Sequence, residues 1–132
     1  MLVETDVLVA FMDLEDPNHE IAKRVFTEYS IALSPYALIE LDLLIRSSII
    51  VVRDYSMFWR KLDDVFKQYR IEVIKPRSIH FTKAHELRIQ YNLTYFDSLH
   101  AATAIIEDLE FVSFDRRAYS EIAGLKYQYP KT

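Results

Sequence analysis

Acidic side chains stand at several places where a folded chain normally buries apolar ones. From Ala37 to Ile45 the only charged residues are Glu40 and Asp42, and apolar side chains otherwise surround the segment. A helix with that pattern is normally buried on most sides. A carboxylate there is costly unless a cation or hydrogen bonds compensate. Glu40 is therefore a candidate ligand, and the alternative is an outward-facing acid paired with Arg46.

Asp97 lies in a second segment of small and apolar residues, which suggests close packing against a sheet. Thr94 stands three residues before it, in the pattern of a helix capping box. Asp97 therefore has two interpretations, a site residue and a helix cap.

Three further acids follow short apolar segments directly. Glu4 and Asp6 come after Leu2-Val3, and Asp115 comes after the run that ends at Phe114. Each also suits a plain cap or first-turn acid. Their joint placement favours a site, because open parallel sheets bind ligands beyond the carboxyl ends of their strands. We expect acids from two strand ends and two helices to converge on one cleft.

The chemistry of such a cluster is that of a hard cation. The chain has no cysteine, which excludes thiolate ligands and disulfides. Carboxylate oxygens prefer Mg²⁺ or Mn²⁺, and ions held in this way support phosphodiester hydrolysis.

Short apolar segments alternate with helical ones along the chain. Ser34-Pro35 is a clear helix start, and Asn18 is a good N-cap. This alternation predicts one α/β domain over residues 1–132, with a central, mostly parallel sheet of four or five short strands and helices on both faces. We expect strands at residues 2–3, 31–33, 71–74, 111–114 and 125–129, and helices at residues 7–12, 19–29, 35–45, 56–69, 79–90, 96–108 and 117–123.

The bulk composition says less about the function than the placement of the acids does. The first residues do not resemble a signal peptide, and no apolar run is long enough for a membrane span, so we expect a soluble, cytoplasmic protein. The formal net charge of −4 counts against a nucleic-acid partner. A nuclease whose acids hold cations is an exception, because the ions change the local field.

Taken together, these segments resemble the PIN-domain ribonucleases, and among them the toxins of VapBC-type toxin–antitoxin pairs. The resemblance covers nearly the whole chain, and the order and spacing of its landmarks carry it. These are Val3-Glu4-Thr5-Asp6-Val7-Leu8-Val9, Leu33-Ser34-Pro35 leading to Glu40, Tyr95-Phe96-Asp97-Ser98-Leu99-His100-Ala101-Ala102 and Phe111-Val112-Ser113-Phe114-Asp115.

One landmark departs from the family pattern. Where the family usually has an Asp-Thr pair after the first strand, this chain has Glu4-Thr5. Glu4 then takes the place of the first metal-binding aspartate, and Asp6 follows on the same side of an extended segment. Glu40, Asp97 and Asp115 match the other three acidic positions.

The resemblance implies a metal-dependent endoribonuclease that uses Mg²⁺ or Mn²⁺ to cut RNA. It also implies a homodimer held inactive by a cognate antitoxin. Ser113 occupies a hydroxyl position near the fourth acid, and Asp42 is expected outside the ligand set.

The remaining polar residues have plainer interpretations. His100 follows Asp97 by three residues and is either a proton donor or, as we favour, a packed histidine. We expect His19, His80 and His85 on the surface. Arg116 and Arg117, beside Asp115, are candidates to contact RNA phosphate.

A surplus of apolar and aromatic residues in the middle of the chain, here called the aromatic surplus, suits either core packing or a groove for an antitoxin helix. Its members are Tyr55, Met57, Phe58, Trp59, Phe66 and Tyr69.

Two alternatives to a nuclease remain. One is a PIN-like binding module that lost its metal site through Glu4 and acts by RNA or protein contacts. The other is a receiver-like or phosphatase-like domain. The lack of an Asp-x-Asp pair after the first strand, and of a lysine after a late strand, argues against the latter.

Overall fold

The computed structural model describes residues 1–130 and places a parallel sheet at the centre of the molecule. The sheet has five strands of two residues each in the order β3-β2-β1-β4-β5, and every neighbouring pair is parallel. The prediction of a parallel central sheet is confirmed. The strands are β1 (Leu2–Val3), β2 (Ala32–Leu33), β3 (Glu72–Val73), β4 (Phe111–Val112) and β5 (Tyr127–Gln128).

Both faces of the sheet are covered by apolar side chains. In β1, β2 and β4 the first residue, such as Leu2, packs into one cluster, and the second, such as Val3, packs into the other. This follows from the alternation of side chains along a strand. A sheet buried on both faces is typical of parallel α/β proteins.

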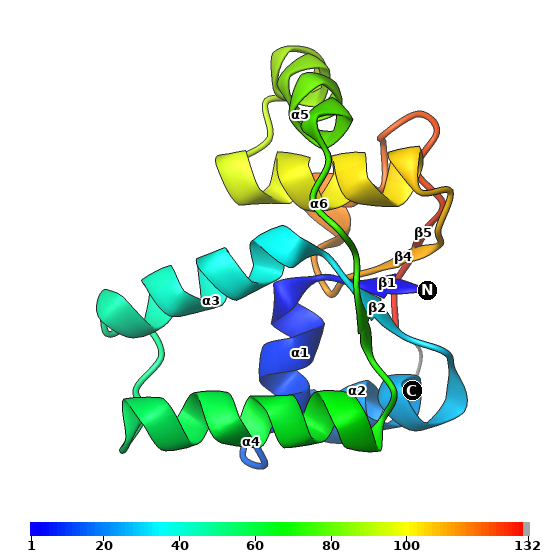
Figure 1. Cartoon of the computed structure of the whole chain (residues 1–132). Helices are drawn as coiled ribbons and strands as arrows, with labels where there is room; N and C mark the ends of the chain where they lie inside the picture. Colours follow the sequence, from blue (N-terminus) through cyan, green and yellow to red (C-terminus); the bar gives the residue numbers. More distant parts are fainter. Residues whose placement is uncertain (131–132) are drawn as a thin grey trace.

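Helices form the outer two layers, as predicted. Helices α1, α2 and α4 pack on the Val3 face, and α5, α6 and α7 on the Leu2 face (Figure 1). Within residues 1–130 no helix is long and apolar enough to cross a bilayer. The helices are α1 (Thr5–Met12), α2 (His19–Glu28), α3 (Pro35–Arg46), α4 (Tyr55–Gln68), α5 (Ser78–Tyr91), α6 (Tyr95–Ile106) and α7 (Arg116–Tyr119).

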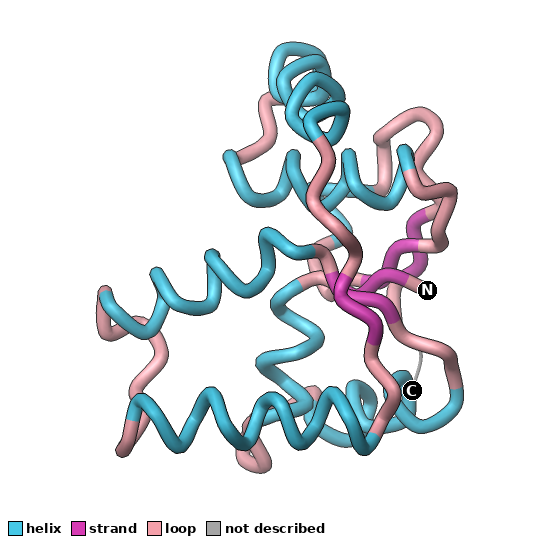
Figure 2. The backbone as a smooth tube through the Cα atoms, viewed as in Figure 1, coloured by secondary structure: helices cyan, strands magenta, loops and turns pink. Residues whose placement is uncertain are grey.

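The start of α3 follows the signal in the sequence, whereas Asn18 occupies the N-cap position of α2 without a side-chain capping bond. The Ser34 hydroxyl accepts a hydrogen bond from the Tyr36 N–H at 3.2 Å, and Pro35 occupies the first helical position of α3. The strand–helix boundaries that result lie together at the carboxyl end of the sheet (Figure 2). The prediction of a helix over 117–123 is wrong in extent, because the Ile122 N–H bonds to the Tyr119 carbonyl in a tighter turn that ends α7.

Two of the three histidines expected on the surface are buried instead. His19 Nδ1 lies 3.0 Å from the Ala10 carbonyl, and His80 has no exposed surface. Only His85 lies exposed as expected. The prediction was wrong because the partners that allow burial are distant in sequence.

His80 joins three helices through its two ring nitrogens. Nε2 lies 2.6 Å from Glu107 Oε2, just beyond the end of α6, and Nδ1 lies 2.8 Å from the Tyr36 hydroxyl of α3. A carboxylate only accepts, so Nε2 carries the proton and Nδ1 accepts from Tyr36. The guanidinium of Arg77 donates to the same carboxylate at 3.1 Å.

Replacing His80 is expected to weaken the fold. His80→Ala removes the three hydrogen bonds of the ring, one of them from the Arg77 N–H, and leaves the Tyr36 hydroxyl buried without a partner. We therefore expect a loss of about 2–4 kcal/mol in the free energy of unfolding. Glu107→Gln keeps an acceptor for Nε2 and should cost about 1 kcal/mol. Urea unfolding of the three proteins checks this, and equal losses for the two variants would contradict it.

Candidate metal centre

Glu4 lies where the central strand meets the first helix. It occupies the N-cap position of α1 directly after β1, is only 6% exposed, and makes no side-chain capping bond. Its carboxylate is instead turned toward Ser113, whose hydroxyl lies 3.1 Å from Glu4 Oε2. A buried carboxylate therefore stands at the carboxyl end of β1.

Glu40 and His100 form the opposite side of this centre. His100, on α6, has no exposed surface, and its Nε2 donates to Glu40 Oε1 at 2.8 Å. Thr5 Oγ1 lies 3.3 Å from the same nitrogen. Glu40 is therefore paired with a histidine, and the alternative pairing with Arg46 is not found within residues 1–130.

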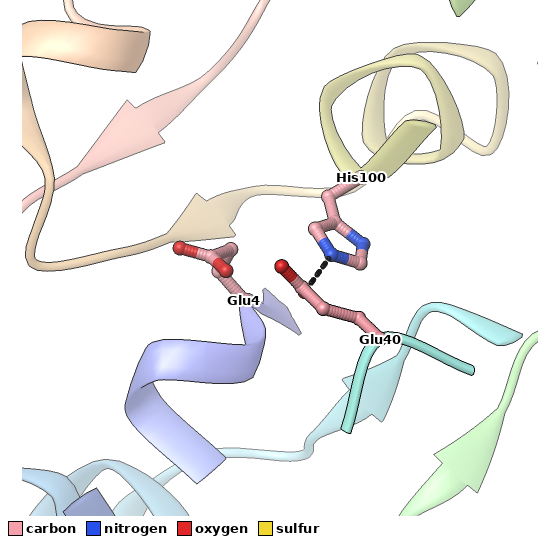
Figure 3. A group of neighbouring side chains, drawn as sticks. All are labelled: Glu4, Glu40 and His100. Carbon is pink, nitrogen blue, oxygen red and sulfur yellow. Dashed lines mark hydrogen bonds and ion pairs between the residues drawn. The ribbon is translucent and has the colours of Figure 1, made fainter. Parts of the chain in front are cut away.

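Glu4, Glu40 and His100 together make a compact group of donor atoms. One ligand atom from each lies within 4.8 Å of the others. Figure 3 shows the Glu4 and Glu40 side chains close to one another, with the imidazole hydrogen-bonded to Glu40. The sequence treated His100 as a packed residue more than a site residue, and it proves to be both buried and part of this group.

Asp97 lies beside this group, in the first turn of α6. Its negative charge contributes to the raised pKa of Glu4, after burial and the charges of Asp6 and Glu40. Its N–H donates to the Thr94 hydroxyl at 3.4 Å, so the predicted cap exists. Among residues 1–130 the Asp97 carboxylate makes no hydrogen bond back to Thr94, so its oxygens are not used in the helix cap.

Asp6 anchors the end of β4. Its Oδ2 accepts from the Ser113 hydroxyl and the Phe114 N–H, both at 3.0 Å, while its Oδ1 is buried with no partner among the described residues. The expectation of an extended segment here was wrong, because α1 already begins at Thr5. Glu4 and Asp6 nevertheless converge on the Ser113 hydroxyl, whose single proton serves two carboxylates.

Asp115 lies at the edge of the site. It is exposed, its Oδ1 accepts from the Ala118 N–H at 3.1 Å as the N-cap of α7, and its own N–H donates to Ser113 Oγ at 3.0 Å. Its contacts fit the plain capping alternative, and it is not among the three residues whose donor atoms are close together.

The electrostatics of the centre follow from burial and crowding. Burial raises the pKa of Glu4 well above its ordinary value, and the charges of Asp6, Glu40 and Asp97 raise it further. Burial also raises the pKa of Asp6, although the bonds from Ser113 and Phe114 oppose it. Burial acts to raise the pKa of Glu40 too, but the hydrogen bond and positive charge of His100 outweigh it, so that pKa is lowered.

This donor set fits a divalent cation. The acids supply hard oxygen ligands, one buried oxygen of Asp6 has no partner, and the repulsion around Glu4 lacks a compensating charge. The residues whose donor atoms lie close enough together to share an ion are Glu4, Glu40 and His100, and the charge of Asp97 acts on Glu4.

The remaining candidates lie outside the centre. Arg116 and Arg117 are exposed, and the Arg116 guanidinium stacks 4.0 Å from the ring centre of Tyr129. Tyr55 and Met57 are about half exposed. The rest of the aromatic surplus packs against the core, namely Phe58, Trp59, Phe66 and Tyr69.

The raised pKa of Glu4 predicts a pH-dependent instability of the metal-free protein. The folded state binds the Glu4 proton more tightly than the unfolded state, whose pKa is near 4.5, so this contribution to stability falls as pH rises above 4.5. Glu4→Gln is expected to raise the melting temperature by a few degrees at pH 7 in chelator, and by less at pH 5. Thermal unfolding at the two pH values measures this. A variant less stable than the parent at pH 7 would contradict the crowding of charge around Glu4.

Comparisons with known proteins agree with this architecture. The family model described as PIN domain matches residues 1–125, whereas no curated protein sequence matches the chain significantly. Three solved structures show the same fold. VapBC2 from Rickettsia felis, bound to a DNA fragment from its promoter, is 19% identical, with a TM-score of 0.75 over 97% of this chain and 96% of that one. A toxin–antitoxin complex from Klebsiella pneumoniae is 18% identical, with a TM-score of 0.73 over 98% and 97%. Mycobacterium tuberculosis VapC20, described as a sarcin–ricin loop cleaving toxin, is 15% identical, with a TM-score of 0.65 over 94% and 97%. The chain that carries this acidic centre at the end of its central strand belongs to the PIN domain family.

Proposed function

We propose that this protein is a metal-dependent endoribonuclease and the toxin of a VapBC-type toxin–antitoxin pair, acting in the cytoplasm. The gathering of Glu4, Glu40 and His100 from three elements at the end of β1, with the charge of Asp97 acting on Glu4, carries the proposal. Membership of the PIN family supports nuclease chemistry. The likeness to toxin–antitoxin complexes and to a toxin that cleaves the sarcin–ricin loop supports the biological role.

The five acids have different parts in this proposal. Glu4, Glu40 and Asp97 hold Mg²⁺ or Mn²⁺, the unpartnered Oδ1 of Asp6 is a further oxygen ligand, and Asp115 borders the site where RNA enters. Bound ions of this kind activate a water molecule and neutralise charge on the leaving oxygen.

Two neighbouring groups position the acids, and a third is placed to contact the RNA. His100 fixes Glu40 in its ionised form, and Ser113 fixes Glu4 and Asp6 by sharing one hydroxyl between them. Arg116, exposed beside Asp115, is suited to contact the RNA backbone.

A second candidate function has its own observation. Glu4 stands where the family usually has aspartate, and its burial favours the protonated form that binds no cation. A PIN-like binding module without catalysis would follow if the ion never displaced that proton.

The decisive experiment is cleavage of a structured RNA by the purified protein. We expect cutting with Mn²⁺ or Mg²⁺ and none with chelator, and we expect Asp97→Asn to lower the rate by at least about a hundredfold, because a charged ligand of the ion is lost. Asp63→Asn is the matched control, since Asp63 lies exposed on α4, away from the centre.

The outcomes separate the candidates. No cutting, together with no Mn²⁺ binding by calorimetry, would leave the binding module. Cutting that survives Asp97→Asn would remove Asp97 from the site.

An apolar pocket provides the proposed surface for an antitoxin. It has a volume of about 460 Å³, lies between α1, α3 and the start of α4, and is lined by Leu8, Leu41, Ile49 and Val51 among others. Ile49 and Val51 are 72% and 84% exposed, which is unusual for side chains of this size unless a partner covers them. An amphipathic antitoxin helix suits such a groove.

Val51→Asp is expected to weaken antitoxin binding by at least about tenfold without changing RNA cleavage by the free protein, because it places a charge in the apolar contact. Ile89→Asp is the matched control, since Ile89 is 74% exposed on the opposite helical layer. Binding is measured by calorimetry. An effect at Ile89 and none at Val51 would move the antitoxin to the other layer.

The homodimer that belongs to the same proposal is tested by light scattering, and a monomer would contradict it.

A further inference from the structure

A pocket between α2 and the edge strand β5, here called the β5 pocket, has no part in the chemistry described so far. Its volume is about 530 Å³, within the range of roughly 300–1,000 Å³ that accommodates small ligands. Arg24, Glu28 and Tyr29 line it from the end of α2, and Tyr127 and Tyr129 line it from β5 and the residues that follow. Charged and aromatic side chains from two distant parts of the chain therefore face one space.

The β5 pocket adjoins the metal centre through direct contacts. The Tyr127 hydroxyl donates a hydrogen bond to the Ser113 carbonyl at 2.8 Å. Ser113 is the residue whose hydroxyl contacts two carboxylates of the centre. Arg116, which also lines the pocket, directly follows Asp115 at the edge of the centre. An RNA strand with a phosphate at the metal centre therefore has this pocket beside it.

One side of the β5 pocket presents a cation stacked on a ring. The Arg116 guanidinium lies 4.0 Å from the ring centre of Tyr129, and Phe114 packs edge-on against the same ring at 5.9 Å. Within residues 1–130 Arg116 forms no salt bridge. A guanidinium held over a ring keeps its N–H donors for a phosphate and its outer face for a base.

The α2 side of the β5 pocket combines a loosely held cation with an exposed ring. Arg24 Nε lies 3.6 Å from Glu28 Oε1, and the two side chains are 56% and 54% exposed. An ion pair of this kind contributes little to stability, so the guanidinium can exchange the carboxylate for a phosphate. Tyr29 is 53% exposed, and an accessible tyrosine ring is a stacking surface for any base.

We propose that the β5 pocket binds single-stranded RNA on one side of the bond that is cut, with backbone phosphates on Arg24 and Arg116 and a base stacked on Tyr29. This inference rests on the proposed function, because it extends the path of the substrate away from the same metal centre. Two arginines against one glutamate give the pocket a positive balance, in a chain whose formal net charge is −4. Phosphate contacts and stacking both tolerate any base sequence.

The test is the fluorescence anisotropy of a labelled single-stranded RNA of about ten nucleotides, measured in chelator so that nothing is cut. We expect Tyr29→Ala to weaken binding about tenfold at unchanged salt dependence, because a stacking surface is lost. We expect Arg24→Gln to weaken binding about three- to tenfold, and to reduce the slope of log affinity against log salt by about 0.7, because one phosphate contact is lost.

Glu28→Gln should act in the opposite direction. It removes the negative charge from the pocket and releases Arg24, so RNA should bind about two- to threefold more tightly. A purely structural role for the Arg24–Glu28 pair predicts no such gain.

Lys83→Gln and Tyr55→Ala are the matched controls. Lys83 pairs with Glu86 at 3.5 Å on the surface of α5, and Tyr55 is 48% exposed on α4. Neither residue lines the β5 pocket, so both variants should bind RNA like the parent.

The outcomes separate this inference from the proposed nuclease. Unchanged RNA affinity in Arg24→Gln and Tyr29→Ala would overturn the β5 pocket as an RNA site, and metal-dependent cleavage by the parent would leave the nuclease intact. Weaker antitoxin binding by the two variants, at unchanged RNA affinity, would assign the pocket to the antitoxin instead. The expected losses of RNA affinity in a parent that cuts no RNA with either ion would keep the RNA site and remove the nuclease.

Discussion

Repulsion between carboxylates at the carboxyl end of β1 is the constraint on which the rest of this structure depends. Glu4 is held there with almost no access to water, and acids from α1, α3 and α6 face it. Such an arrangement opposes folding, because each buried charge loses hydration and gains unfavourable neighbours. The surrounding elements hold it together by packing, since a sheet of two-residue strands contributes few hydrogen bonds of its own.

Two hydrogen-bond donors, Ser113 and His100, hold different acids of the centre in place. Ser113, at the end of β4, serves Glu4 and Asp6 on one side of the centre, and His100 serves Glu40 on the other. The serine carries no charge, so it orients its acids without neutralising them. The histidine lowers the pKa of its acid and keeps it ionised. The raised pKa values of Glu4 and Asp6 therefore favour their protonated forms, whereas Glu40 is held in the ionised form that binds a cation.

The sequence predicted the fold, and it singled out the candidate acids, for identifiable reasons. Strands and helices alternate with distinct start signals, as at Ser34-Pro35, and Glu40 and Asp97 are conspicuous because they interrupt apolar segments. The environment of His80 was not predictable, because its partners Tyr36 and Glu107 lie 44 and 27 residues away. The same limit applies to Ser113, which meets Glu4 and Asp6 from more than a hundred residues along the chain. Asp115 shows the opposite case, where the simple local interpretation as a cap accounts for its contacts.

Helices α3 and α6 are joined at two separate points, and this has a mechanical consequence. Tyr36 connects through His80 to Glu107, and one turn further along α3, Glu40 connects to His100. A single attachment leaves two rods free to pivot, whereas two attachments fix both their spacing and their rotation. The distance between Glu40 and the neighbouring acids is therefore set by the scaffold before any ligand arrives. A site built in this way loses little conformational freedom on binding, and more of the interaction energy remains as affinity.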